Sequence, residues 1–115
     1  MKTSRIGSVV CAGLLLGLVS AATASAETQW EKSHPRRDEV NDRLENQNKR
    51  IHEGAKEGQL TPREARRLHR EDRSIRRQER RYARHHHGHI SKAEQERLNR
   101  EENHVSGQIH EERHD

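Results

Sequence analysis

The sequence predicts an all-α fold in which a helical hairpin and a third helix form a small antiparallel three-helix arrangement. One observation is a seven-residue pattern that occurs twice, thirty positions apart, as residues 58–64 and 88–94. A fixed internal period indicates repeated structural units. The other observation is that apolar residues stand seven positions apart, or two helical turns, in three segments. These pairs are Leu44 and Ile51, Leu68 and Ile75, and Leu98 and Val105.

The repeated pattern has the chemistry of a turn followed by a helix start. In the first copy Gly58 permits the turn, Thr61 can cap the helix, and Glu64 stands three residues later to complete a capping box. In the second copy the same positions hold Gly88, Ser91 and Glu94. Each copy therefore predicts that a new helix begins directly after a reversal of the chain.

The N-terminal residues 1–26 have the signature of a secretory signal peptide. Lys2 and Arg5 precede an apolar run, and the small residues Ala24-Ser25-Ala26 provide a cleavage site. We predict a periplasmic or secreted protein that begins at Glu27 and has no membrane span after cleavage. The single cysteine, Cys11, lies within the signal, so the exported chain is expected to contain neither thiols nor disulfides.

The exported chain is expected to contain one helical unit. We predict a loose leader at residues 27–34, with Trp30 as its only anchor, followed by a helical repeat unit at residues 35–115. Gly54 is expected to end the first helix. The predicted helices span approximately residues 35–52, 62–84 and 92–112.

The composition indicates a fold of marginal stability. Only 27% of the residues are hydrophobic, whereas 37% are charged. Burial of so few apolar side chains barely offsets the conformational entropy lost on folding. Small chains without disulfides usually require a metal, self-association or a partner. We therefore expect the unit to be marginally stable or partly disordered on its own.

Histidines provide the candidate ligands. One group surrounds Gly88 at a predicted helix end, and a pair stands one turn apart on the third helix; together they are His85, His86, His87, His89, His110 and His114. Neutral imidazole is a good ligand for Cu(II), Ni(II) and Zn(II). We predict a divalent transition-metal site in the His-rich turn, with affinity that falls at acid pH because protonated imidazole cannot bind. The alternative is a solvated helix end that binds metal adventitiously.

The two turns also resemble the second half of EF-hand calcium loops, which read G-x-[IL]-[ST]-x-x-E. A working loop needs oxygen ligands in its first half as well. The first copy offers Glu53 and Glu57 there, whereas the second offers His85 and His87, which are poor calcium ligands. A degenerate, weak calcium binder is therefore an alternative, and capping chemistry alone also explains the pattern.

The charge pattern limits the remaining function classes. Residues 62–89 carry ten arginines, but four acidic residues interrupt them, which favours a solvated helix face over a nucleic-acid surface. No cysteine and few serines are available for catalysis, so we predict a non-enzymatic protein. The narrow apolar seams support another alternative, a helical interaction protein that assembles with a second copy or another helical chain.

The repeats are similar to those of small exported bacterial proteins of unassigned role that carry tandem G-x-L-T-x-x-E-A-x-x-L helices. The first copy meets this pattern in full with Gly58, Leu60, Thr61, Glu64, Ala65 and Leu68. The second copy has Gln95 in place of the alanine and otherwise matches with Gly88, Ile90, Ser91, Glu94 and Leu98. The resemblance implies export and helical repeats, and it implies no chemistry.

Overall fold

The computed structural model describes residues 27–114, and the predicted signal peptide lies outside the described residues. The all-α class is confirmed, with four helices and no strand in the described part of the chain. The helices are α1 (Gln29–Ser33), α2 (Pro35–Lys56), α3 (Pro62–His85) and α4 (Lys92–His114). None of these four helices is long and apolar enough to cross a membrane.

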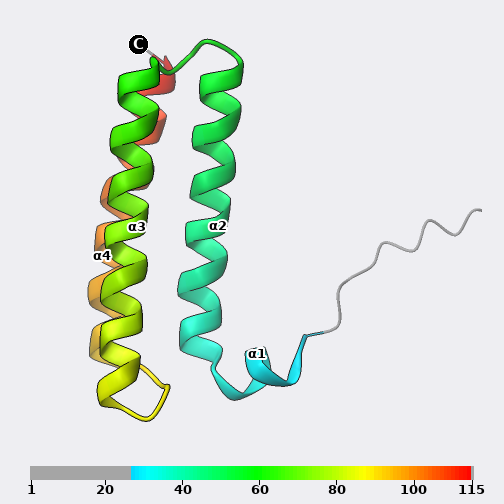
Figure 1. The fold of residues 1–115 in the computed structure, drawn as a ribbon, viewed down its shortest axis with the longest axis vertical. Helices are drawn as coiled ribbons and strands as arrows, with labels where there is room; N and C mark the ends of the chain where they lie inside the picture. Colours follow the sequence, from blue (N-terminus) through cyan, green and yellow to red (C-terminus); the bar gives the residue numbers. More distant parts are fainter. Residues whose placement is uncertain (1–26, 115) are drawn as a thin grey trace, which may run out of the picture.

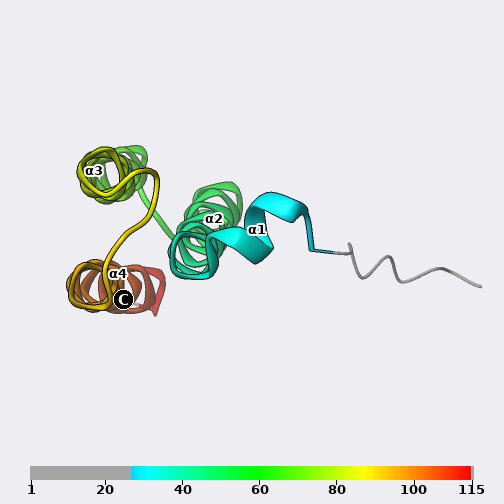
Figure 2. The same cartoon turned by 90° about the horizontal axis from the view of Figure 1, so that it is seen from below.

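The three long helices pack side by side, each against the other two. The chain runs along α2, returns along α3 and turns again into α4, so that α2 and α4 run in the same direction (Figure 1). Seen along their axes, the three form a triangle, and α1 packs on the outside of α2 (Figure 2).

The helices α3 and α4 begin with the same capping chemistry. The hydroxyl of Thr61 accepts a hydrogen bond from the Glu64 amide at 3.1 Å, and the Glu64 carboxylate accepts one from the Thr61 amide at 2.8 Å. Ser91 and Glu94 form the same two bonds at the same distances. These bonds satisfy amides that the start of a helix leaves unpaired. The repeated pattern is therefore a repeated helix start.

The prediction that Gly54 ends the first helix is wrong, because α2 continues to Lys56. The chain reverses instead at Gly58, which has a φ of +76°. Gly54 allows close packing: a Cβ atom at this position would lie 2.9 Å from Cδ1 of Leu60. The amide of Leu60 also donates to the Gly54 carbonyl at 3.1 Å. The turn can therefore fold back tightly over the last turns of α2.

The predicted loose leader contains the short helix α1. Its start uses a third capping box, in which the Thr28 hydroxyl accepts a hydrogen bond from the Glu31 amide at 3.1 Å. Residues 28–31 thus carry the same T-x-x-E signature as the start of α3, just before the first long helix. Trp30 is 40% exposed rather than buried in the core.

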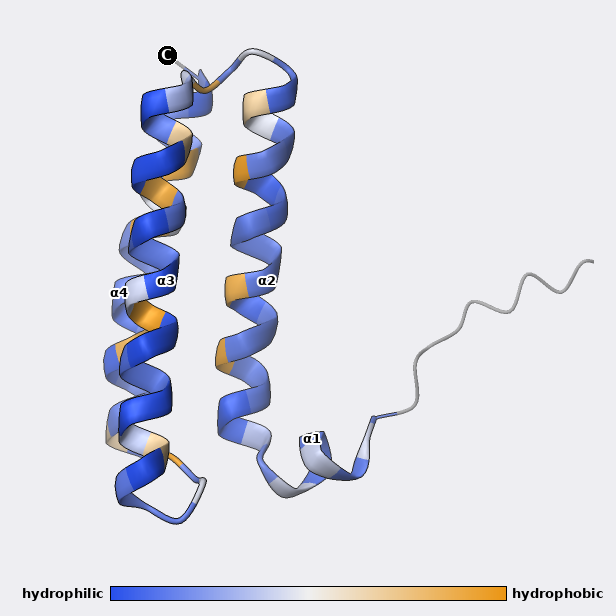
Figure 3. Ribbon diagram, viewed as in Figure 1, coloured by the Kyte–Doolittle hydropathy of each residue, from blue (hydrophilic) through white to orange (hydrophobic). Residues whose placement is uncertain are grey.

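The core is a single apolar cluster along the axis of the three long helices. The apolar residues at equivalent positions of the two sequence patterns are all buried in this cluster: Leu60 and Ile90, Leu68 and Leu98, and Ile75 and Val105. Apolar residues lie where the helices face one another, and the outer surfaces are hydrophilic (Figure 3). The buried apolar residues are Val40, Leu44, Ile51, Leu60, Ala65, Leu68, Ile75, Ala83, Ile90, Leu98, Val105 and Ile109.

Candidate functional site

The histidines of the predicted metal site lie in two groups at opposite ends of the bundle (Figure 1). His85, His86, His87 and His89 lie where α3 turns into α4, and His110 and His114 lie on the last turns of α4. All six side chains are exposed. Because α4 has 23 residues, its axis is about 35 Å long at ~1.5 Å per residue. The two groups cannot bind one ion together.

The four histidines of the α3–α4 loop are not brought together around one point. His86 directly follows α3, and its Nε2 lies 3.3 Å from Oε2 of Glu94. His87 has a φ of +54° next to Gly88 with a φ of +92°, so the chain reverses between His86 and His89. Among residues 27–114, no group of three or more metal-ligating side chains is assembled. The loop offers ligands in pairs.

His89 is paired with a histidine that the sequence patterns did not single out. Its ring stacks on His34, with ring centroids 4.5 Å apart, and His34 stacks in turn on Trp30 at 4.6 Å. Nδ1 of His34 lies 2.9 Å from the Trp30 carbonyl. Because a carbonyl only accepts hydrogen bonds, Nδ1 carries the proton and Nε2 is left as the free nitrogen. His34 and His89 are far apart in sequence, so no local spacing indicates this pair.

Two arginines at the start of α2 hold the loop in place. The guanidinium of Arg37 donates to the Gly88 carbonyl at 3.0 Å, and that of Arg36 donates to the Ile90 carbonyl at 3.2 Å. The guanidinium carbon of Arg37 also lies 5.2 Å from the centre of the Trp30 ring. The loop is therefore fixed to α1 and α2 as well as to its own helices.

At the other end of the bundle, the structure brings His110 and His114 together. They stand on consecutive turns of α4 with ring centroids 4.4 Å apart. Arg113, between them in sequence, donates to Oε1 of Gln59 at 2.6 Å and to the Arg50 carbonyl at 3.3 Å. These bonds hold the last turns of α4 against α2 and the α2–α3 turn. The pair therefore lies on a well-supported helix end.

The two carboxylates that match the last EF-hand ligand position act as caps. Oε1 of Glu64 accepts from the Thr61 amide, and Oε1 of Glu94 accepts from the Ser91 amide. Hydrogen bonds from Thr61 lower the pKa of Glu64. Capping chemistry therefore accounts for the position of both carboxylates.

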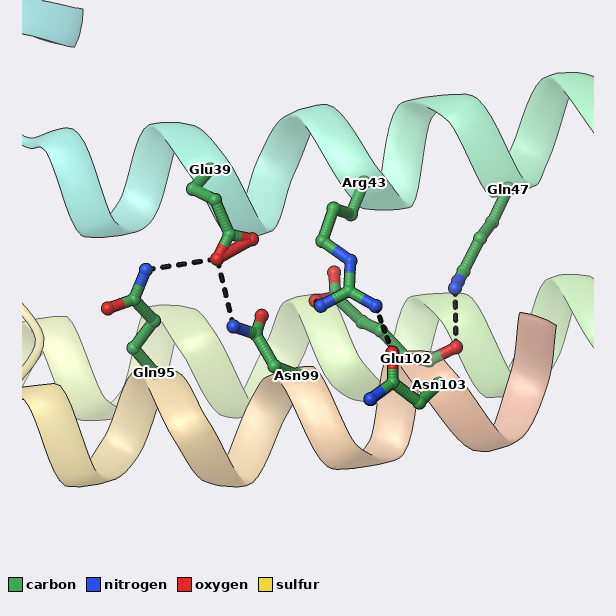
Figure 4. A network of polar contacts seen from close by, with 7 residues as sticks. All are labelled: Glu39, Arg43, Gln47, Gln95, Asn99, Glu102 and Asn103. Carbon is green, nitrogen blue, oxygen red and sulfur yellow. Dashed lines mark hydrogen bonds and ion pairs between the residues drawn. The ribbon is translucent and has the colours of Figure 1, made fainter. Parts of the chain in front are cut away.

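Polar side chains cross the interior between α2 and α4 (Figure 4). Oε1 of Glu39 accepts hydrogen bonds from Gln95 at 3.0 Å and Asn99 at 2.9 Å. The buried Gln47 donates from Nε2 to the carbonyl of Glu102 at 2.6 Å. Such bonds fix the lengthwise register of the two helices, because a shift by one residue breaks all of them.

Two buried carboxyl groups occupy the same position of the two repeats. Asp72 and Glu102 stand thirty positions apart and are 2% and 0% exposed. Burial raises the pKa of Asp72 to about 7. Burial also raises the pKa of Glu102 to about 8, although Arg43, 3.7 Å from Oε1, opposes the shift. The core therefore contains two groups that gain or lose protons near neutral pH.

Comparison with protein-family models, curated proteins and solved structures found no match for this chain.

Proposed function

We propose that this protein is exported, is not an enzyme, and binds a divalent transition metal through its histidine side chains. The observation that carries the proposal is the pair His110 and His114, with ring centroids 4.4 Å apart on consecutive turns of α4. Two imidazoles on one helix face, four residues apart, can share one ion. Nitrogen ligands favour Cu(II) over Ni(II) and Zn(II), and they disfavour calcium.

The loop supplies a second, weaker location. His86 with Glu94 offers one nitrogen and one oxygen ligand 3.3 Å apart. His89 and His34 offer two nitrogens, but their rings are stacked at an angle of 15°. Each nitrogen lone pair lies in the plane of its own ring, so in two nearly parallel stacked rings the lone pairs do not converge on one point. Binding there requires a ring to rotate out of the stack, so we expect the α4 pair to bind first.

Metal binding would also stabilise the fold. The helices α2, α3 and α4 are proposed to form the cooperative three-helix unit, because α1 contacts α2 alone. The end of a helix frays more readily than its middle. An ion held across the last turns of α4 binds only when those turns are helical, and it therefore raises the melting temperature.

The test is a calorimetric Cu(II) titration of the whole chain and three variants. We expect His110→Asn with His114→Asn to remove the tightest site. The replacement of His85, His86, His87 and His89 by asparagine should leave that site in place. His104→Asn is the matched control, because His104 is exposed on the same helix but has no second histidine one helical turn away.

If the His110/His114 double variant binds Cu(II) as tightly as the parent and the loop variant does not, the α4 pair is not the primary site. If the parent does not bind below millimolar Cu(II), the metal proposal fails altogether. The interaction-protein alternative then gains support if sedimentation shows self-association of the metal-free chain.

A further inference from the structure

The exposed surface of α3 consists almost entirely of arginine. Apart from the terminal residues Pro62 and His85, every exposed residue of this helix is an arginine. These residues, named here the arginine face, are Arg63, Arg66, Arg70, Arg73, Arg77, Arg80, Arg81 and Arg84. They recur mainly at intervals of three and four, which places them on one side of a helix.

The acidic residues of α3 do not interrupt this face. Asp72 and Glu79 are buried in the core, 2% and 1% exposed. Glu64 caps the start of the helix, and Glu71 is half-buried. The four acidic residues interrupt the arginines in the sequence, but none of them belongs to the arginine face.

The other long helices have mixed surfaces. On α2, the acidic residues Asp42 and Glu45 are exposed beside Lys49. On α4, Glu96 and Glu111 are exposed on the same helix as Arg100. The concentration of one charge sign is therefore specific to α3 and does not follow from the small net charge of the chain, +4.

The arginine face is long, and its arginines at the loop end lie around a groove. From residue 63 to residue 84 it extends about 30 Å, at ~1.5 Å per residue. At the end near the α3–α4 loop, a groove of about 640 Å³ is lined by Arg77, Arg80, Arg81 and Arg84, together with Arg37 of α2. Within the described part of the chain, none of these four α3 arginines forms an ion pair. Like charges so close together repel one another, and an anionic ligand relieves that repulsion.

An exposed tryptophan lies beside this groove. Arg37 lines the groove and also lies 5.2 Å from the ring of Trp30. Trp30 is the one large hydrophobic side chain exposed among residues 27–114, at 40%. Tryptophan is enriched at the level of lipid headgroups, where its ring contacts acyl chains and its N–H remains hydrated. A basic face beside such a residue is the combination found in proteins that lie on membranes.

We propose that the arginine face of α3 is a docking surface for the phosphate groups of an anionic lipid membrane, with Trp30 at the headgroup level. The planar guanidinium forks bind phosphate oxygens in pairs. No aromatic residue belongs to the arginine face, so it lacks the stacking platform that single-stranded nucleic acid requires. The face runs lengthwise along the outside of one straight helix, so it can lie along a flat bilayer.

The test measures binding of the whole chain to vesicles of phosphatidylglycerol and of phosphatidylcholine by sedimentation. The face variant carries Arg70→Gln, Arg73→Gln, Arg77→Gln and Arg84→Gln. The matched control removes the same charge from exposed positions of α2 and α4, with Lys49→Gln, Lys56→Gln, Lys92→Gln and Arg100→Gln. Glutamine has nearly the helix propensity of lysine and arginine, so both variants keep their helices. Residues 1–26 are the same in every chain, so their contribution cancels when a variant is compared with the parent on the same vesicles.

We expect the face variant to lose roughly a hundredfold or more in affinity for phosphatidylglycerol vesicles, because each basic residue at an anionic surface contributes separately. The control variant should lose much less. The fluorescence of Trp30, the single tryptophan, should shift to the blue with phosphatidylglycerol and not with phosphatidylcholine.

Equal losses in the two variants would show that net charge, and not the face, governs binding, and would overturn the proposal. Parent binding that does not distinguish the two lipids would overturn it as well. Tighter binding to a DNA duplex than to phosphatidylglycerol vesicles at the same salt concentration would assign the face to nucleic acid instead.

Discussion

Arg37 of α2 and Glu79 of α3 form an ion pair inside the bundle, with Nε and Oε1 2.5 Å apart. The Glu79 side chain is 1% exposed and that of Arg37 is 18% exposed. The same guanidinium donates to the Gly88 carbonyl, so one side chain connects α2, α3 and the α3–α4 loop. This connection has a measurable energetic consequence.

Arg37→Met should destabilise the protein by about 3 kcal/mol or more, because the Glu79 carboxylate is left buried without its partner. The double variant Arg37→Met/Glu79→Leu should recover more than half of that loss, since it removes the buried charge. Urea unfolding followed by circular dichroism gives both values. A double variant no more stable than the single one would show that the bond to Gly88 dominates instead.

Leu68→Ala should cost about 2–3 kcal/mol of unfolding free energy, at the low end of the range for buried leucine, because the thin bundle closes only partly around the cavity. Leu68 is fully buried on α3. Arg70→Ala on the exposed side of the same helix is the control and should stay within ~0.5 kcal/mol. Equal effects of the two substitutions in urea unfolding would contradict the position of the core.

Thr61→Ala and Ser91→Ala should each cost about 1 kcal/mol, because each removes the acceptor for an amide at the start of a long helix. The two effects should be alike, since the two capping boxes have the same bond lengths. Thr28 caps only α1, which packs against α2 alone. Thr28→Ala should therefore leave the melting temperature nearly unchanged. A Thr28 effect as large as that of Thr61 would mean that α1 belongs to the cooperative unit.

The stability of the fold should depend on pH through Asp72 and Glu102. Their folded-state pKa values, about 7 and about 8, lie above those of unfolded carboxyl groups, at about 4. The folded state therefore binds more protons between pH 4 and pH 8, and these groups destabilise it increasingly as the pH rises through that window. Asp72→Asn and Glu102→Gln remove the buried charge while keeping the shape.

At pH 8.5 each of these variants should melt several degrees above the parent, given ~4–8 °C per kcal/mol for a domain of this size. The advantage should disappear toward pH 4, where the native carboxyl groups are protonated. Glu45→Gln, an exposed acid on α2, is the control and should show no such trend. Circular dichroism melts across the pH range make the comparison. A constant difference between variant and parent would refute the raised pKa values.

Much of the fold was predictable because it depends on local chemistry. The capping boxes place the starts of α3 and α4, and the apolar spacing identifies Leu68 and Leu98 as core residues. The four-residue interval of His110 and His114 likewise predicts their proximity, since it is one helical turn. These features need no knowledge of the neighbouring helices.

Other features depend on contacts between distant parts of the chain. Gly54 resembles a helix end in the sequence, but its role is set by Leu60 folding back over it. His89 resembles a member of the loop cluster, but its ring stacks on His34 of another segment. Two other features are visible in the sequence itself: the T-x-x-E pattern at Thr28, which marks the start of α1, and the regular spacing of the arginines on α3.

The two chain reversals share one helix, and this has a consequence for folding kinetics. Either hairpin, α2 with α3 or α3 with α4, can form first, because each closes through a short turn with its own cap and needs only local contacts. Whichever forms first presents α3 and one partner to the remaining helix. We therefore expect two parallel folding routes. A substitution that slows one of them, such as Thr61→Ala, should redirect molecules through the other and lower the overall folding rate only slightly.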